Sequence, residues 1–188
     1  EQGYRDFTGV NLSGIDLSGI MLIGVNLTAA NLVGANLSRA FLTKSILSEA
    51  TFNWANLSFA KMSEVNLAQA DLTKANLTGA FMVKSQLTDA QLSGANLAHA
   101  NLRAANLLGA NLCGAKLFKV NLRQANLTQT NLKWADLRQG RLTGAQLQGS
   151  SLTGVNLGQT FLIDVDLSST DLRGINFSQA RLTKANLS

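Results

Sequence analysis

The chain offers few side chains of the kinds that carry out catalysis, and they are scattered. His99 is its single histidine and Cys113 its single cysteine. Neither lies in a motif with the nucleophile, base or further ligands that a catalytic or zinc site needs. The N-terminal glycines follow a five-residue period, which is not a phosphate-loop spacing: Gly9, Gly14, Gly19 and Gly24. We predict no catalytic, cofactor-binding or metal-binding residues, and no enzyme activity.

Two carboxylates, Asp166 and Asp171, are close enough in sequence to be considered as an acid–base pair. They occupy equivalent positions of a short repeat, where Asp commonly accepts hydrogen bonds from nearby backbone N–H groups. We therefore interpret them as turn-stabilising residues. His99 and Cys113 fall at corner positions of the same repeat, and we expect both at the surface.

The repeat is set by a leucine-like residue at every fifth position from Phe7 to Leu187, which makes 37 consecutive positions. All are Leu except five: Phe7, Phe52, Met62, Met82 and Phe177. An α-helix would spread these residues around its whole surface. A continuous strand would send successive ones to opposite faces, because five is odd. A short extended segment followed by a corner in each unit keeps all of them inside.

Each unit reads small–Asn–Leu–polar–polar. The position two before the leucine is mostly Ala, and the position between them is Asn 17 times and Asp 6 times among 37 units. Side chains two apart share one face of an extended segment, so the small residue and the leucine point inward together. Asn or Asp then points outward, and the last two residues form the corner.

This unit resembles the pentapeptide-repeat family, whose pattern is A-(N/D)-L-x-x. Direct matches occur at 95–97, 105–107 and 125–127, and the resemblance covers residues 5–188. It implies an all-β fold, a right-handed quadrilateral β-helix with four units per coil. The chain would then be a single domain over residues 1–188, with about nine coils of 20 residues.

Deviations from the repeat support four units per coil independently. The residues before the leucine at positions 21, 41, 61 and every twentieth position to 181 depart from Asn or Asp in seven of nine units. Elsewhere only seven of 28 depart. A deviation that recurs every 20 residues predicts that these positions stack on one face.

The deviating column is a candidate partner-binding stripe: Met21, Phe41, Lys61, Phe81, Arg141, Phe161 and Arg181. Ile23, Val83 and Ile163 should lie on the same face. Exposed apolar surface of this kind suggests contact with a partner protein. The alternative is that the bulky side chains stack along the shaft and shield the backbone.

Charge is distributed unevenly along the chain, whose net charge is +5. Residues 1–100 hold six Lys/Arg and seven Asp/Glu, whereas residues 101–188 hold ten and four. The candidate basic patch in the second half is Arg103, Arg123 and Arg141. This break raises the hypothesis that two shorter repeat proteins, 1–100 and 101–188, were joined in register without a linker. The alternative is that the charges only keep the surface solvated.

We therefore predict a non-enzymatic, rigid scaffold or protein-binding module whose partner is an unidentified protein. Some members of the resembled family bind type II topoisomerases as DNA mimics, but a chain with net charge +5 does not suit that role. The other alternative is binding of anions or nucleic acid through the basic patch. The ends of such a solenoid invite an end-to-end homodimer.

No apolar run is long enough for a membrane span, and no signal peptide is visible. The resemblance implies a bacterial, often cyanobacterial, protein of the cytoplasm, with the lumen or periplasm as the alternative. It implies no cofactor.

Overall fold

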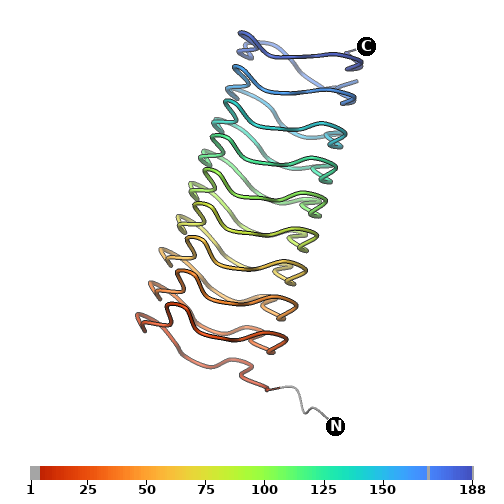
Figure 1. Cartoon of the computed structure of the whole chain (residues 1–188). Helices are drawn as coiled ribbons and strands as arrows, with labels where there is room; N and C mark the ends of the chain where they lie inside the picture. The colour runs from red at the N-terminus through yellow and green to blue at the C-terminus, as the bar shows by residue number, and fades with distance from the viewer. Residues whose placement is uncertain (1–4, 169, 188) are drawn as a thin grey trace.

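Parallel backbone bridges between residues 20 apart build the fold. The computed structural model describes residues 5–168 and 170–187. Four bridge series run along it, starting at Asp6 (side 1), Asn11 (side 2), Asp16 (side 3) and Met21 (side 4), and each links a residue to the one 20 positions later. Figure 1 shows the resulting stack of coils, with the two termini at opposite ends of a rod. The repeat thus closes a four-sided coil every 20 residues, as predicted.

In the described part of the chain the bridges are single residues, with no longer strand and no helix. The predicted extended segments are therefore present, but they are too short to form continuous strands. The reason is the corner that follows every central residue, because it ends the ladder before a second pair can form. These ranges also hold no helix that could cross a membrane.

Five positions recur in each unit: a bridge residue, a central residue, two turn residues and a small residue. In one unit, Asn96 donates its N–H to Ala75 of the preceding coil at 2.9 Å, and Leu97 donates to Lys116 of the next at 2.7 Å. The second turn residue, His99, donates to Phe118, and Ala100 closes the turn onto Leu97. The first turn residue, Ala98, donates to no backbone carbonyl but to Oδ1 of Asn96 at 3.1 Å. Proline is therefore tolerated best at the first turn position of units whose bridge residue does not accept this N–H.

The second turn residue has a positive φ throughout the rod, between 55° and 70°. A turn with a positive φ at its third residue is of type II, where Gly is favoured. Only 13 of these positions are Gly; the others include Arg39, Trp54 and Lys119. Side chains in this left-handed conformation cost free energy, which the hydrogen bonds and the core offset.

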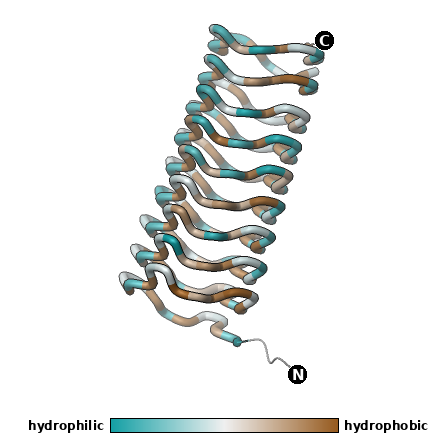
Figure 2. The backbone as a smooth tube through the Cα atoms, in the orientation of Figure 1, coloured by the Kyte–Doolittle hydropathy of each residue, from teal (hydrophilic) through white to brown (hydrophobic). Residues whose placement is uncertain are grey.

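The core consists of the central and small residues, which are two apart and point inward together. The central residues from position 27 to position 167 are all buried. Small residues such as Ala35, Ala55 and Ala75 are completely inaccessible and keep the rod narrow. Hydroxyl side chains in this column bond to a backbone carbonyl nearby, as Ser85 does to Met82 at 2.7 Å. Figure 2 shows apolar residues recurring in every coil along the rod.

Bridge residues of successive coils form side-chain amide ladders. On side 3, Asn56 donates from Nδ2 to Oδ1 of Asn36 at 3.1 Å, and Asn76 donates to Asn56 at 3.2 Å. The same oxygens accept the N–H of the first turn residue, as Asn56 does from Ser58. Asn therefore recurs at this position because it satisfies both the corner and the next coil.

Large side chains at the second turn position lie over the glycine of the next coil. A Cβ added to Gly154 would overlap the ring of Trp134, whereas one added to Gly94 would meet only Lys74 Cγ at 3.6 Å. We expect Gly154→Ala to displace Trp134 and change its fluorescence maximum, and Gly94→Ala to leave the emission as it is. Emission spectra of both variants in a Trp54→Phe background measure this. An unchanged spectrum for Gly154→Ala would contradict the packing.

Candidate partner-binding surface

The structure places all seven residues of the candidate stripe in one column on side 4. Backbone bridges join Met21 to Phe41, Phe41 to Lys61 and Lys61 to Phe81. A second run of bridges joins Arg141 to Phe161 and Phe161 to Arg181. The column is therefore continuous in register, and Asn101 and Asn121 occupy the gap between the two runs.

Cations and rings alternate within this column and stack on each other. The Lys61 ammonium lies 3.7 Å from the centroid of the Phe81 ring, and the Arg181 guanidinium lies 5.1 Å from that of Phe161. Such cation–π contacts contribute about 0.5–1 kcal/mol at exposed sites. The alternative that the bulky side chains stack on each other therefore holds for part of the column. Much of the apolar surface of the column nevertheless stays uncovered.

The uncovered apolar surface of side 4 is concentrated in its N-terminal half. Met21 is 63% exposed and Ile23 52%, and Phe41 and Phe81 are also exposed. Phe161, further along the side, is only partly exposed. An apolar patch among cations is typical of a surface that contacts a protein.

Side 4 carries most of the unpaired positive charge of the rod. Eight Lys or Arg residues lie on it and all eight are exposed: Lys44, Lys61, Lys84, Arg103, Arg123, Arg141, Arg181 and Lys184. The side holds two acidic residues, Glu64 and Asp164. By contrast, side 1 has no Lys or Arg and four acidic residues: Asp6, Glu49, Asp89 and Asp166. The charges are thus sorted around the circumference of the rod as well as along it.

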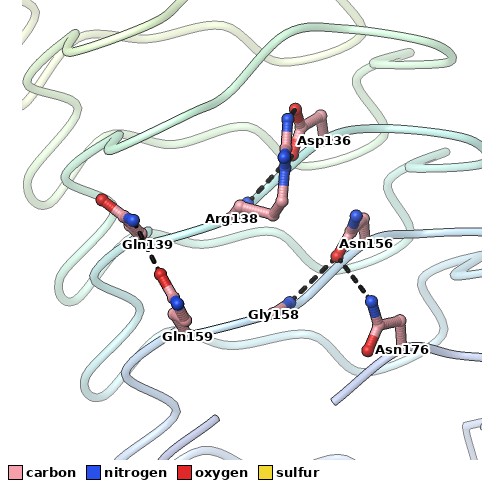
Figure 3. A network of polar contacts seen from close by, with 7 residues as sticks. All are labelled: Asp136, Arg138, Gln139, Asn156, Gly158, Gln159 and Asn176. Atoms are coloured by element: carbon pink, nitrogen blue, oxygen red, sulfur yellow. Dashed lines mark hydrogen bonds and ion pairs between the residues drawn. The ribbon is translucent and has the colours of Figure 1, made fainter. Parts of the chain in front are cut away.

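The ion pairs of the described residues lie elsewhere. Arg138 on side 3 pairs with Asp136, and Arg173 on side 2 pairs with Asp171, both at 2.7 Å. Hydrogen bonds from the Arg173 guanidinium lower the pKa of Asp171 to about 2, and those from Arg138 lower the pKa of Asp136. Figure 3 shows the Arg138–Asp136 pair beside the amide ladders. In the described ranges no cation of side 4 has such a carboxylate partner.

The residues considered for catalysis are dispersed. Asp166 and Asp171 accept the N–H of Ser168 and Arg173, which confirms their role in turns. His99 is exposed and packs edge-on against Phe118, with ring centroids 5.8 Å apart. Cys113 is half-buried, slightly less open than predicted. No group of His, Cys, Asp or Glu that could hold a metal ion occurs in residues 5–168 and 170–187.

Several charged and amide residues of this surface were not singled out from the sequence. They include four lysines of side 4 and three glutamines at positions 139, 159 and 179. The lysines are Lys44, Lys61, Lys84 and Lys184; Lys61 was assigned to the stripe, but not to a basic surface. The signal was present in both cases, because Lys44, Lys84 and Lys184 recur at multiples of 20 in one column and the three glutamines do so in another, while Lys61 lies on the same side at a bridge position. The pattern is visible when charged and amide residues are grouped by the side of the rod on which they lie, rather than by the half of the chain to which they belong.

The comparisons with known proteins agree with the repeat. A family model described as pentapeptide repeats matches eight copies, at residues 6–39, 21–58, 50–89, 85–124, 95–133, 105–144, 130–168 and 162–188. The chain belongs to the pentapeptide repeat family. No catalytic family is among the matches, and no curated protein sequence matches significantly.

Solved structures of other pentapeptide repeat proteins are similar to this chain. HetL of the cyanobacterium Nostoc sp. strain PCC 7120, which is involved in the regulation of heterocyst differentiation, is 33% identical over 99% of this chain and 88% of its own, with a TM-score of 0.44. QnrB1, a plasmid-mediated fluoroquinolone resistance protein, is 17% identical over 94% and 90%, with a TM-score of 0.53. A thylakoid-lumen protein of Arabidopsis thaliana is 29% identical over 53% and 69%, with a TM-score of 0.52.

Proposed function

We propose that this pentapeptide repeat protein is a rigid, non-enzymatic binding module that docks side 4 on the acidic surface of a partner protein. The rod that presents this side would be a right-handed quadrilateral β-helix of about nine coils, as the family resemblance and the 20-residue bridge period favour. The observation that carries the proposal is the set of eight exposed cations on side 4, none of them paired with a carboxylate in the described residues.

Electrostatics and burial together favour an acidic protein. Like charges stacked in neighbouring coils repel each other, so an anionic partner would gain free energy by relieving that repulsion. The exposed Met21, Ile23 and Phe41 at one end of the side supply apolar area that a partner can bury. Because the rod is preformed, little conformational entropy is lost when a partner binds.

Nucleic acid is the alternative that the same cations allow. Single-stranded nucleic acid binds best where aromatic rings are free to stack with bases. On side 4, the rings of Phe81 and Phe161 already hold Lys61 and Arg181 against them, which leaves the exposed Phe41, among the described residues, as the one phenylalanine ring of this side without such a contact. The side therefore suits carboxylates on a protein better than bases.

DNA mimicry at a type II topoisomerase would instead use an acidic side. Side 1 is the candidate, because it carries no Lys or Arg. Its four carboxylates are widely spaced, with Asp6 and Glu49 two coils apart and Asp89 and Asp166 about four. This density is far below one negative charge per 1.7 Å of duplex axis.

Photo-crosslinking from each side of one coil tests the proposal. A benzoylphenylalanine residue is placed at Ser63 (side 4), Ala68 (side 1), Thr73 (side 2) or Thr78 (side 3), which are all half-buried first turn residues. We expect the Ser63 variant to crosslink one acidic protein in cells and the other three to give no common product. Mass spectrometry identifies the products.

Two outcomes would contradict the proposal. Equal crosslinking from all four variants would show that no side is specific. A basic protein captured from the Ala68 variant alone would show that the acidic side is the one used, and would favour DNA mimicry.

A further inference from the structure

A groove runs along the edge between sides 3 and 4 in the C-terminal half of the rod. It has a volume of about 720 Å³. One wall consists of second turn residues of side 3 and the other of bridge residues of side 4, so the groove follows the rod axis over several coils. The residues that decide its chemistry are Lys119, Gln139, Arg141, Gln159, Phe161 and Arg181.

The groove is cationic throughout. Lys119, Arg141 and Arg181 line it, and no acidic residue does. All three cations are exposed, and within the described ranges none forms an ion pair. The two arginines present planar donor groups that match a carboxylate with two parallel hydrogen bonds.

The opposite wall is a ladder of primary amides. Gln139 donates from Nε2 to Oε1 of Gln159 at 2.7 Å, and Gln159 donates to Gln179 at 2.8 Å (Figure 3 shows the first of these). Each amide nitrogen carries two hydrogens and each amide oxygen two lone pairs, and the ladder uses one of each. The row therefore keeps spare donors and acceptors, which can bond to the backbone of an extended chain.

The two rings that line the groove, His99 and Phe161, are poor stacking platforms because both already have partners. His99 packs edge-on against Phe118, with ring centroids 5.8 Å apart. The Arg181 guanidinium lies on Phe161, 5.1 Å from its centroid, so this ring and this cation already contact each other. Amide hydrogen-bonding groups and arginines, with no free ring, suit a polypeptide with carboxylate side chains better than a nucleic acid.

We propose that this groove binds an extended, acidic segment of polypeptide. Its carboxylates would pair with Arg141 and Arg181, and its backbone would hydrogen-bond to the spare amide groups of Gln139, Gln159 and Gln179. The inference rests on the proposed function, because the segment would belong to the acidic partner, and it assigns a specific subsite within that surface.

Two double variants with the same net charge test the groove. Arg141→Gln/Arg181→Gln removes cations that line it, whereas Arg103→Gln/Arg123→Gln removes two exposed cations of side 4 that do not. The probe is a fluorescein-labelled peptide of alternating glutamate and serine, titrated with the full chain and followed by anisotropy. We expect the groove variant to bind about tenfold more weakly for each arginine lost, which corresponds to about 1.4 kcal/mol of binding free energy per arginine, because hydrogen bonds between charged groups are among the strong ones. The control should lose far less.

A third variant tests the amide wall. Gln159→Leu keeps the charge of the groove but breaks the ladder, and we expect binding several-fold weaker than that of the parent. Circular dichroism and thermal unfolding show whether each variant retains the fold. The five replaced residues are all exposed and lie at turn or bridge positions, so their replacement should not disturb the core.

Three outcomes would contradict the proposal that the groove binds an acidic segment. The first is an equal loss in both double variants, which would mean that only the overall charge of side 4 matters. The second is a single-stranded oligonucleotide of equal charge that binds more tightly than the peptide and depends on the same arginines. The third is no peptide binding while Ser63 still crosslinks an acidic protein; this leaves the proposed function in place. Crosslinks spread over all sides with groove binding intact would contradict the proposed function instead.

Discussion

Asn96→Pro is expected to destabilise the rod by about 3 kcal/mol or more, whereas Ser93→Pro in the same coil should change its stability by less than about 1 kcal/mol. Asn96 donates its N–H to Ala75 of the preceding coil at 2.9 Å, and proline has no hydrogen to donate. The pyrrolidine ring would also press against that carbonyl. A bond between two coils is lost in the middle of the stack, where no other group replaces it.

Ser93 is the matched control because it is a first turn residue. Its N–H has no acceptor in the structure, and its position in a type II turn is the one that proline favours. The chain contains no proline at all. The backbone hydrogen bonds explain why four of every five positions exclude it. At the fifth position the N–H often donates to Oδ1 of the bridge residue, as Ala98 does to Asn96, and proline would remove that bond as well.

The two tryptophans measure whether the break separates the rod into halves. Trp54 and Trp134 lie on the same side, two coils before and two coils after the coil of Asn96. Urea unfolding is followed in single-tryptophan variants, Trp134→Phe and Trp54→Phe. We expect coincident transitions in the parent chain and separated ones after Asn96→Pro, because a solenoid is stabilised by contacts between neighbouring coils. Equal urea midpoints for Asn96→Pro and Ser93→Pro would contradict the prediction that the Asn96 hydrogen bond between coils stabilises the rod.

The same experiment addresses the hypothesis that two repeat proteins were joined near residue 100. The bridges run without interruption across that point, from Phe81 to Asn101 and from Asn96 to Lys116. The change of charge there is therefore not accompanied by a change in backbone pairing. Whether each half folds alone stays a prediction, which expression of residues 1–100 and 101–188 would test.

The five-residue period was enough to predict the inward residues, the corners and the 20-residue coil. Leu97 and Ala95 are buried, as their spacing of two residues predicts, and Asn96 between them accepts the N–H of Ala98 in its own turn. The period did not predict that the extended segments would reduce to single bridges, because that depends on how early each corner interrupts the ladder. Nor did it predict the side chains that stand in the left-handed conformation, since Arg39 or Trp54 at such a position is disfavoured locally.

The candidate surface was only partly predictable. The stripe of Met21, Phe41 and Phe81 was visible as a departure from the repeat. The sorting of charge was missed because charge was compared along the chain, whereas the fold distributes residues around a circumference. The groove depends on how the side chains of sides 3 and 4 lie along the edge between them, which no periodicity specifies.

Phe52→Ala should cost about 3–5 kcal/mol, and Phe52→Leu less than about 1.5 kcal/mol. Phe52 is a completely buried central residue in a column that is otherwise mostly leucine. Alanine leaves a cavity that the hydrogen-bonded coils above and below cannot close, because their spacing is fixed by backbone bonds such as Phe52 N–H to Asp71 at 2.6 Å. Leucine restores the residue that the repeat prefers. Chemical denaturation of both variants gives the two free energies of unfolding.

The distance over which the Phe52→Ala cavity destabilises neighbouring coils shows whether the binding side depends on the whole rod or only on nearby coils. Each coil contacts only its neighbours, so amide hydrogen exchange in Phe52→Ala should accelerate near residues 31–35, 51–55 and 71–75 and stay as in the parent near residues 131–135. Binding of the acidic peptide to the distant groove should then be unchanged. Acceleration along the whole rod, with weaker peptide binding, would instead mean that the coils unfold as one unit and that the rigidity of side 4 depends on every one of them.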